Sequence, residues 1–134
     1  MKAICRLLLV SLLFAGCFRP GGGGTTHIPP EQIVNGEPTE LRMDFSVWGA
    51  GSGNLANRYT KVVCIYRVND SGEEHRIDGV VVTADEKRMA MKFTIPPLEL
   101  KNGDNVTYNF EMLFDGHANK RKGGTLLAIE SGNP

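Results

Sequence analysis

Apolar and polar side chains alternate strictly from Glu40 onward, and this pattern predicts half-buried β-strands. Side chains two residues apart lie on the same face of a strand, so the first strand turns one apolar face toward a core. That face consists of Leu41, Met43, Phe45 and Val47. The same alternation returns over residues 59–68, 88–95 and 106–114, and a last strand is expected near residues 125–130.

The segments between these strands carry turn signals: NDSGEE, DEKR, the pair Pro96-Pro97 and DGHANKRKGG. The stretch HRIDGVVVTA, residues 75–84, is expected to form one strand. No window shows the period of a helix. Six or seven short strands spaced about ten residues apart are typical of a β-sandwich or a barrel. The sequence therefore predicts one all-β domain over residues 40–134.

The first residues have the organisation of a secretory signal peptide. Lys2 and Arg6 precede the short apolar run LLLVSLLFAG, which ends in small residues before Cys17. Phe14-Ala15-Gly16-Cys17, with a leucine one place earlier, resembles the lipobox of bacterial lipoproteins. The resemblance implies that residues 1–16 are removed and that the Cys17 thiol receives a diacylglyceryl group. An ordinary signal peptide followed by a cysteine remains the alternative.

The resemblance also implies a cellular location for the protein. Phe18, rather than an aspartate, follows Cys17, which resembles lipoproteins sent to the outer membrane; in a Gram-positive source the anchor lies in the plasma membrane. The membrane is then a partner through the lipid on Cys17, because each buried methylene adds about 0.8 kcal/mol of membrane affinity. No stretch approaches the roughly 20 apolar residues of a membrane-spanning helix.

Residues 17–39 are rich in Gly, Pro and Thr and show no period, which is typical of a flexible tether. A coil of this length has a root-mean-square reach of roughly 25 Å and stretches to about 70 Å. We expect a disordered tether that holds the domain clear of the lipid head groups. The alternative is that the portion IPPEQIV docks as an edge strand.

One eleven-residue stretch indicates a family of sandwiches. In LKNGDNVTYNF, residues Leu100, Asp104, Tyr108 and Phe110 resemble the tyrosine corner of immunoglobulin-like domains. The resemblance implies an immunoglobulin-like β-sandwich of about seven antiparallel strands. It places Phe110 where such domains have a cysteine, and Cys64 on the second strand, where the partner cysteine lies. We expect the Cys64 thiol to pack against Phe110 as a small hydrophobe.

Composition and charge argue against nucleic-acid binding, and the cysteine content argues against a disulfide. The chain has 134 residues and no formal net charge, and the part from residue 18 onward carries 13 basic and 15 acidic side chains. Nucleic-acid binding requires a clustered basic excess, so no nucleic acid is expected as a partner. Once Cys17 is lipidated, Cys64 has no partner within the chain for a disulfide.

Catalytic and metal-binding motifs are weak. GAGSGN, residues 49–54, does not follow the glycine order of nucleotide-binding loops and leads toward another strand. His27, His75 and His117 are widely spaced, and no G-x-S-x-G elbow is present. We therefore expect no catalytic residues, no metal site and no cofactor.

Two features are candidates for binding. Trp48 follows the alternation onto the outer face of the first strand, beside the glycine loop, and exposed aromatic residues often form contacts with partners. The one basic cluster consists of Lys120, Arg121 and Lys122, in a segment expected to form a loop. Such a loop could contact an anionic lipid or polysaccharide surface. A solvated hairpin tip is the alternative interpretation of this cluster.

The sequence favours a lipid-anchored cell-envelope lipoprotein that acts as a non-catalytic binding or structural module for an envelope protein whose identity is unknown. The alternative is a small envelope enzyme, an enzyme inhibitor or a carbohydrate-binding module that acts on cell-wall or polysaccharide material. An enzyme would require a pocket lined by His75, Asp78 or Glu111. Carbohydrate binding would require Trp48 to be exposed.

Overall fold

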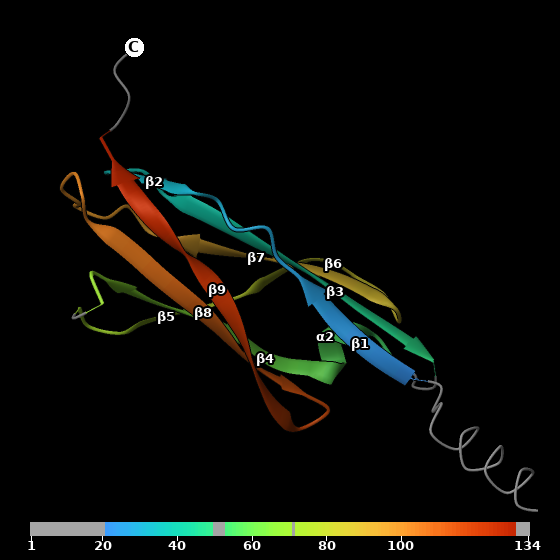
Figure 1. Ribbon diagram of the computed structural model, residues 1–134. Helices are drawn as coiled ribbons and strands as arrows, with labels where there is room; N and C mark the ends of the chain where they lie inside the picture. The colour runs from blue at the N-terminus through green and yellow to red at the C-terminus, as the bar shows by residue number, and fades with distance from the viewer. Residues whose placement is uncertain (1–20, 50–52, 71, 131–134) are drawn as a thin grey trace, which may run out of the picture.

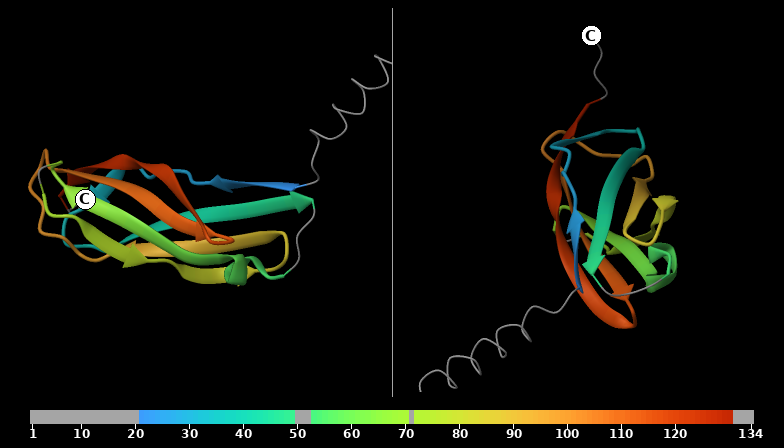
Figure 2. Two further views of the ribbon diagram at one scale, coloured as in Figure 1. Left: turned by 90° about the horizontal axis from the view of Figure 1, so that it is seen from below. Right: turned by 90° about the vertical axis from the view of Figure 1, so that its right-hand side faces the viewer.

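The structure is a computed structural model and describes residues 21–49, 53–70 and 72–130. Within these ranges nine strands and a single-turn helix form two packed sheets, visible as two layers in Figure 2. The elements are β1 (Gly21–Thr26), β2 (Gln32–Val34), β3 (Thr39–Gly49), α2 (Leu55–Arg58), β4 (Tyr59–Val68), β5 (His75–Asp78), β6 (Val80–Ala84), β7 (Arg88–Ile95), β8 (Asn105–Phe114) and β9 (His117–Ile129).

The strand order is that of an immunoglobulin-like sandwich. One sheet has the order β1-β3-β7-β6, which matches strands A, B, E and D of immunoglobulin domains. The other has the order β2-β9-β8-β4-β5, in which β9, β8 and β4 match strands G, F and C. The prediction of an all-β, immunoglobulin-like sandwich is confirmed. Two details differ: the described residues form nine strands rather than about seven, and β2 pairs with β9 in parallel rather than antiparallel.

The alternation read from the sequence produces the core. The odd-numbered residues of β3 from Leu41 to Phe45 are at most 2% exposed. On β7 and β8 the predicted apolar faces also point inward, and the rings of Phe93 and Phe110 meet between the two sheets with centroids 5.0 Å apart. A period of two therefore identified the inner faces of these strands, because one side of each strand packs on the other sheet and the other faces water.

Residues 21–39 do not form the predicted tether. Residues 21–26 form β1 and pair with β3 from Gly21↔Gly49 to Thr26↔Asp44. The portion IPPEQIV contributes β2 at the edge of the second sheet, with Ile33 only 1% exposed. The prediction of a disordered segment is wrong here. Four glycines have no side chains that could show the period of a strand, but their backbone groups still form hydrogen bonds with β3. The alternative, an edge strand, describes residues 32–34.

Because β1 is strand A, every later strand moves one letter along, and Cys64 lies on strand C rather than strand B. Cys64 and Phe110 are cross-strand neighbours on β4 and β8, and both are fully buried. The predicted packing of the thiol against Phe110 is therefore present. However, it lies within one sheet, whereas the disulfide of immunoglobulin domains joins the two sheets.

The stretch HRIDGVVVTA is not one strand. The chain leaves the second sheet after β5, passes Gly79 and enters the first sheet as β6. A Cβ atom at Gly79 would lie 2.6 Å from Met91 Cε and 2.8 Å from Phe93 Cε1. Only glycine fits where the chain crosses this close to the core. Local alternation does not reveal such a crossing, because both halves have the composition of strands.

The loop predicted over residues 115–124 is also absent. Asp115 and Gly116 have φ angles of 48° and 81°, which suit a tight hairpin turn. β9 begins directly after them and pairs with β8 from His117 to Leu127, with a bulge near Gly123. At the other predicted loop, Asn54 caps the short helix α2, while residues 50–52 lie outside the described part of the chain.

The sandwich is elongated, and the described chain begins and ends at opposite ends of it. Gly21, at the start of β1, lies at the end that also holds the last residues of β3, while β9 ends at the far end of the molecule (Figure 1). Cys17, the residue predicted to carry a lipid, precedes Gly21 by only four residues.

Candidate functional site

Trp48 lies near the end of β3 and presents its indole to solvent. Its side chain is 60% exposed, on the face of β3 opposite to the core residues. Its neighbour across the β1–β3 pair is Gly22, which has no side chain to cover the ring. The structure thus shows the exposure expected of Trp48, and its role as a binding contact stays a prediction.

The basic run Lys120-Arg121-Lys122 does not form a loop surface. All three residues lie within β9, so successive side chains point to opposite faces of the sheet. Arg121 turns toward β1, where its Nη1 donates to the carbonyl and to the hydroxyl of Thr25, each at 2.6 Å. The prediction of a single basic patch in a loop is therefore wrong, because strand geometry turns Arg121 to one face while Lys120 and Lys122 share the other.

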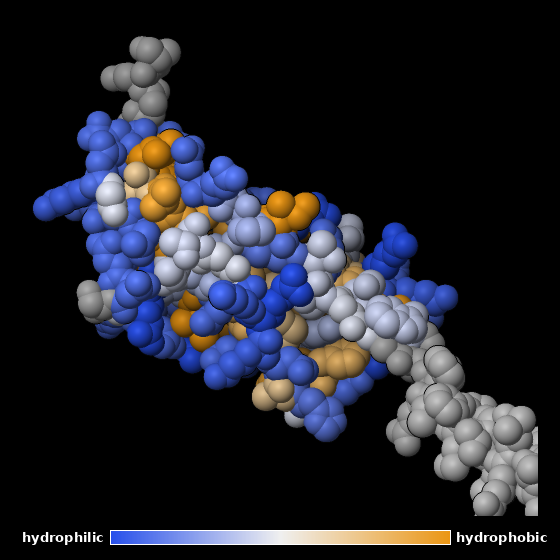
Figure 3. Space-filling model, viewed as in Figure 1, coloured by the Kyte–Doolittle hydropathy of each residue, from blue (hydrophilic) through white to orange (hydrophobic). Residues whose placement is uncertain are grey.

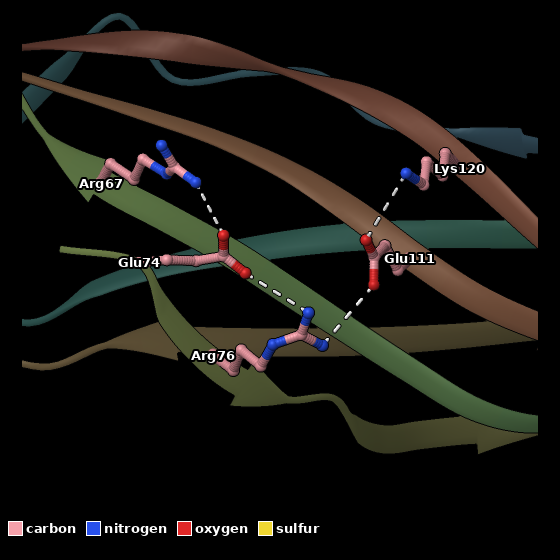
Figure 4. Close-up of polar contacts among 5 residues, drawn as sticks. All are labelled: Arg67, Glu74, Arg76, Glu111 and Lys120. Carbon is pink, nitrogen blue, oxygen red and sulfur yellow. Dashed lines mark hydrogen bonds and ion pairs between the residues drawn. The ribbon is translucent and has the colours of Figure 1, made fainter. Parts of the chain in front are cut away.

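The outer face of the five-stranded sheet carries a chain of ion pairs (Figure 4). Glu74 contacts Arg67 at 2.7 Å and Arg76 at 3.3 Å. Arg76 also contacts Glu111 at 3.5 Å, and Glu111 reaches Lys120 at 3.9 Å. The hydrogen bond from Arg67 holds the pKa of the Glu74 carboxyl below its usual value. These contacts join four strands and the segment before β5 on one polar face.

Two apolar side chains are buried beneath the ion pairs. Val63 and Ile65 on β4 are 2% and 6% exposed, although they lie on the side of the sheet away from the core. Glu111 lies beside Val63, and Arg76 lies beside Ile65. Long charged side chains cover apolar surface with their carbon chains while their charges stay in water. This face therefore offers a partner charged groups rather than exposed apolar area.

An open concavity of about 200 Å³ adjoins the charged face. Glu111 supplies the one carboxylate of its lining, and both carboxylate oxygens take part in the ion pairs. An enzyme would require a pocket lined by His75, Asp78 or Glu111. Of these three residues, only Glu111 lines this concavity. His75 instead stacks on Tyr66, with ring centroids 5.0 Å apart. The lining residues are Lys61, Glu111, Met112, Leu113, Ala118, Asn119 and Lys120.

The residues of the predicted tyrosine corner have different partners. Leu100 is buried in the core. The Asp104 carboxylate accepts hydrogen bonds from the Lys101 backbone N–H at 2.8 Å and from the Asn69 amide at 2.9 Å, and these lower the pKa of Asp104. The Tyr108 hydroxyl bonds to His27, outside the corner. The motif therefore placed Tyr108 on the correct strand, but it did not predict the hydrogen-bond partner of the Tyr108 hydroxyl.

His27, which the sequence analysis placed in the tether, fastens the N-terminal segment to the core. Its Nδ1 lies 2.7 Å from the Arg42 carbonyl oxygen, which only accepts, so Nδ1 carries the proton. Nε2 lies 2.5 Å from the Tyr108 hydroxyl and accepts a hydrogen bond from it. The ring also meets Phe110 edge to face, with centroids 5.1 Å apart. Nothing in the local sequence signals this role, because it depends on a contact with β8.

The edge strand β6 exposes three consecutive valines. Val80, Val81 and Val82 are 57%, 43% and 47% exposed. β6 lies at the edge of its sheet, and no charged residue occurs between Asp78 and Asp85. By contrast, the edge strand β5 carries Arg76, which forms ion pairs with Glu74 and Glu111 in Figure 4. On the face of the molecule in Figure 3, hydrophilic residues predominate and hydrophobic ones form separate patches.

The described residues hold no group of three His, Cys, Asp or Glu side chains close enough to bind a metal ion. Nor does any helix within them have the length and apolarity needed to cross a membrane. Cys17 and the signal peptide lie outside the described residues, so cleavage and lipidation stay predictions.

No protein-family model matches this chain, and no curated protein sequence matches it. Among solved structures, it is similar to an uncharacterized protein from Listeria monocytogenes EGD-e, crystallised in complex with α-D-glucose, β-D-glucose, magnesium and calcium. The similarity has a TM-score of 0.56 at 16% sequence identity and covers 78% of this chain but 10% of that one. The chain thus spans about a tenth of that protein, and the likeness shows the fold alone.

Proposed function

We propose that this chain is a lipid-anchored, non-catalytic module of the bacterial cell envelope that binds a protein partner. The lipobox-like residues before Cys17 support the anchor, and Phe18 supports an outer-membrane address, or the plasma membrane in a Gram-positive source. The observation that carries the binding role is the uncharged edge strand β6 with its three exposed valines.

An edge strand with these properties recognises one kind of ligand. Its outer backbone groups offer hydrogen bonds to an extended segment, and such strand addition is a recurrent mode of peptide recognition. Val80 and Val81 lie on opposite faces of β6 and would contact alternate side chains of the added strand. The partner's segment is therefore extended and apolar on both faces.

The alternative of an enzyme or a carbohydrate-binding module has less support. Hydrolysis of a glycosidic bond normally uses two carboxyl groups that flank the bond. The concavity beside β8 supplies Glu111, and its oxygens are engaged with Arg76 and Lys120. The sugars in the Listeria monocytogenes structure belong to that protein. The exposed Trp48 is the feature that keeps carbohydrate binding testable.

Fractionation of cells that produce the Cys17→Ser variant tests the anchor. The wild-type chain is expected in the membrane fraction with a mass increase at Cys17, and the variant in the soluble fraction. A wild-type chain with an unmodified Cys17 thiol would refute the proposed anchor.

The Val81→Lys variant tests the binding surface. A lysine on an edge strand blocks the pairing of another strand, so crosslinking to an envelope protein should be lost. Leu127→Lys is the matched control, because Leu127 is 58% exposed on β9, in the other sheet. Equal crosslinking of both variants at the wild-type level would exclude β6 as the contact.

A further inference from the structure

The folded domain begins much closer to the lipid site than a tether of residues 17–39 would allow. β1 starts at Gly21, four residues after Cys17. Consecutive Cα atoms are 3.8 Å apart, so the Cα atoms of Cys17 and Gly21 are separated by at most about 15 Å in any conformation. The head-group layer on each side of a bilayer is roughly 5 to 8 Å thick. A lipid on Cys17 therefore holds this end of the sandwich at the membrane surface.

Trp48 lies at this same end. Gly21 pairs with Gly49, and Gly22 pairs with Trp48, in the antiparallel ladder between β1 and β3. Neighbouring strands are about 4.8 Å apart, so the backbone of Trp48 adds little to the distance from Cys17. The indole is 60% exposed, and its cross-strand neighbour is a glycine. The one tryptophan of the chain thus stands uncovered where the anchor brings the protein to the lipid.

Among the described residues, the other groups at this end carry no excess charge. The segment Asp85 to Arg88, which ends on the first residue of β7, contains two acidic and two basic residues, and it contacts β3 through a hydrogen bond from the Val47 N–H to the Lys87 carbonyl. Nearby, Arg58 pairs with Asp115 at 2.7 Å, and its hydrogen bond lowers the pKa of that carboxyl. Attraction to anionic lipid is therefore weak here, and the indole is the group that suits a membrane surface.

The geometry points to a second contact with the membrane: Trp48 enters the head-group layer beside the lipid on Cys17, and this end of the sandwich rests on the bilayer. Tryptophan favours this layer because its ring is apolar while its N–H needs a hydrogen-bond partner. The inference rests on the proposed lipidation of Cys17. It gives the domain an orientation, with the long axis rising from the membrane and the end of β9 pointing away from it.

Fluorescence of the full mature lipoprotein in phosphatidylcholine vesicles tests this contact. Trp48 is the sole tryptophan, so the emission reports on it alone. Relative to the soluble Cys17→Ser chain, the emission should shift to shorter wavelength and be quenched by lipids brominated near the head groups. Because the contact is not electrostatic, the same shift is expected when part of the lipid is replaced by anionic phosphatidylglycerol.

The control moves the probe to the other end of the molecule. The double variant Trp48→Phe with Leu127→Trp places the indole on β9, where Leu127 is 58% exposed and pairs with Gln32 of β2. This chain, lipidated in the same way, should show neither the shift nor the quenching. Equal quenching of the two probes would overturn the proposed orientation.

Three further results overturn the inference, and they differ in what they say of the anchor. Lipidation confirmed by mass spectrometry, with Trp48 unquenched in vesicles, refutes the membrane contact alone. A mature chain with an unmodified Cys17 refutes the proposed anchor and the contact together. A wavelength shift of the soluble Cys17→Ser chain on addition of peptidoglycan fragments, without a shift of the lipidated chain in vesicles, assigns Trp48 to carbohydrate instead.

Discussion

At the scale of single residues, burial controls the chemistry of two titratable groups in the core, Cys64 and Tyr108. Cys64 is fully buried between β5 and β8, and burial raises the pKa of its thiol to about 12. Burial likewise raises the pKa of Tyr108 to about 12. A thiol that stays protonated is a poor nucleophile, so Cys64 acts as a packing residue rather than a reactive one.

The alkaline stability of the domain should depend on Cys64. The folded chain keeps the thiol proton up to about pH 12, whereas the unfolded chain loses it near the ordinary value of 9.0. The associated stability is therefore fully present below about pH 9 and decreases toward pH 12, by roughly 4 kcal/mol in all at about 1.4 kcal/mol for each pKa unit. Urea unfolding of the soluble Cys17→Ser chain, with and without Cys64→Ala, measures this between about pH 8 and 10. Parallel curves would contradict the prediction.

The bond between His27 and Tyr108 should stabilise the whole domain. Tyr108→Phe removes one hydrogen bond and should cost about 0.5–1.5 kcal/mol. His27→Ala leaves the buried hydroxyl without its partner and should cost more, about 1–3 kcal/mol. Denaturant unfolding of both single variants and of the double variant measures the coupling, and His117→Ala, at an exposed histidine, is the control. A cost of His27→Ala no greater than that of His117→Ala would show that the segment before β2 is not fastened.

At the scale of elements, side-chain alternation predicted the strands that have one face in the core. The inner faces of β3, β7 and β8 were predicted correctly, because a strand with one buried face has apolar side chains at every second position. β4 was also found, although it is buried on both faces by its neighbours. Among the candidate site residues, the exposure of Trp48 followed from the same pattern.

What the sequence did not reveal depends on contacts between distant segments. The glycines of β1 have no side chains to carry a pattern, and their partner β3 lies more than twenty residues away. The sequence did not reveal that Arg121 lies on the opposite face from Lys120 and Lys122. A Gly- and Lys-rich segment resembles a loop, but here strand β9 begins directly after a two-residue turn. The exposed edge of β6 follows from the change of sheet at Gly79, which no local window contains.

The crossing at Gly79 gives a test at this scale. Gly79→Ala places a methyl group against Met91 and Phe93 and should destabilise the domain by about 1–3 kcal/mol. Gly24→Ala is the matched control, because an added Cβ there meets nothing within 4 Å. The control should be neutral or stabilising by up to about 1 kcal/mol, since alanine reduces the freedom of the unfolded chain. Thermal or urea unfolding measures the stability of both variants. Equal stability of the two would refute the close approach of Gly79 to Met91 and Phe93.

At the scale of the whole molecule, the position of β1 relative to Cys17 replaces a long tether with a short one. The predicted coil would have let the domain move roughly 25 Å from the lipid, whereas a link of four residues spans at most about 15 Å. The proposed orientation of the sandwich on the membrane thus depends on the length of this link as well as on Trp48.

Lengthening the link should therefore weaken the contact of Trp48 with lipid. Insertion of about twenty Gly and Ser residues after Phe18 restores a reach of roughly 25 Å and lowers the effective concentration of the indole at the surface. Quenching of Trp48 by brominated lipid should fall relative to the wild-type lipoprotein, while fractionation still finds the chain in the membrane. Unchanged quenching in the extended variant would show that the link length does not control the contact.

The pairing of β1 with β3 also determines how the protein, with the proposed lipid on Cys17, would bear mechanical tension. A force that draws the domain away from a lipid on Cys17 enters at Gly21 and acts along the axis of β1. The hydrogen bonds of an antiparallel pair run across that axis, so the ladder from Gly21↔Gly49 to Thr26↔Asp44 is loaded in shear, all at once, rather than peeled open bond by bond.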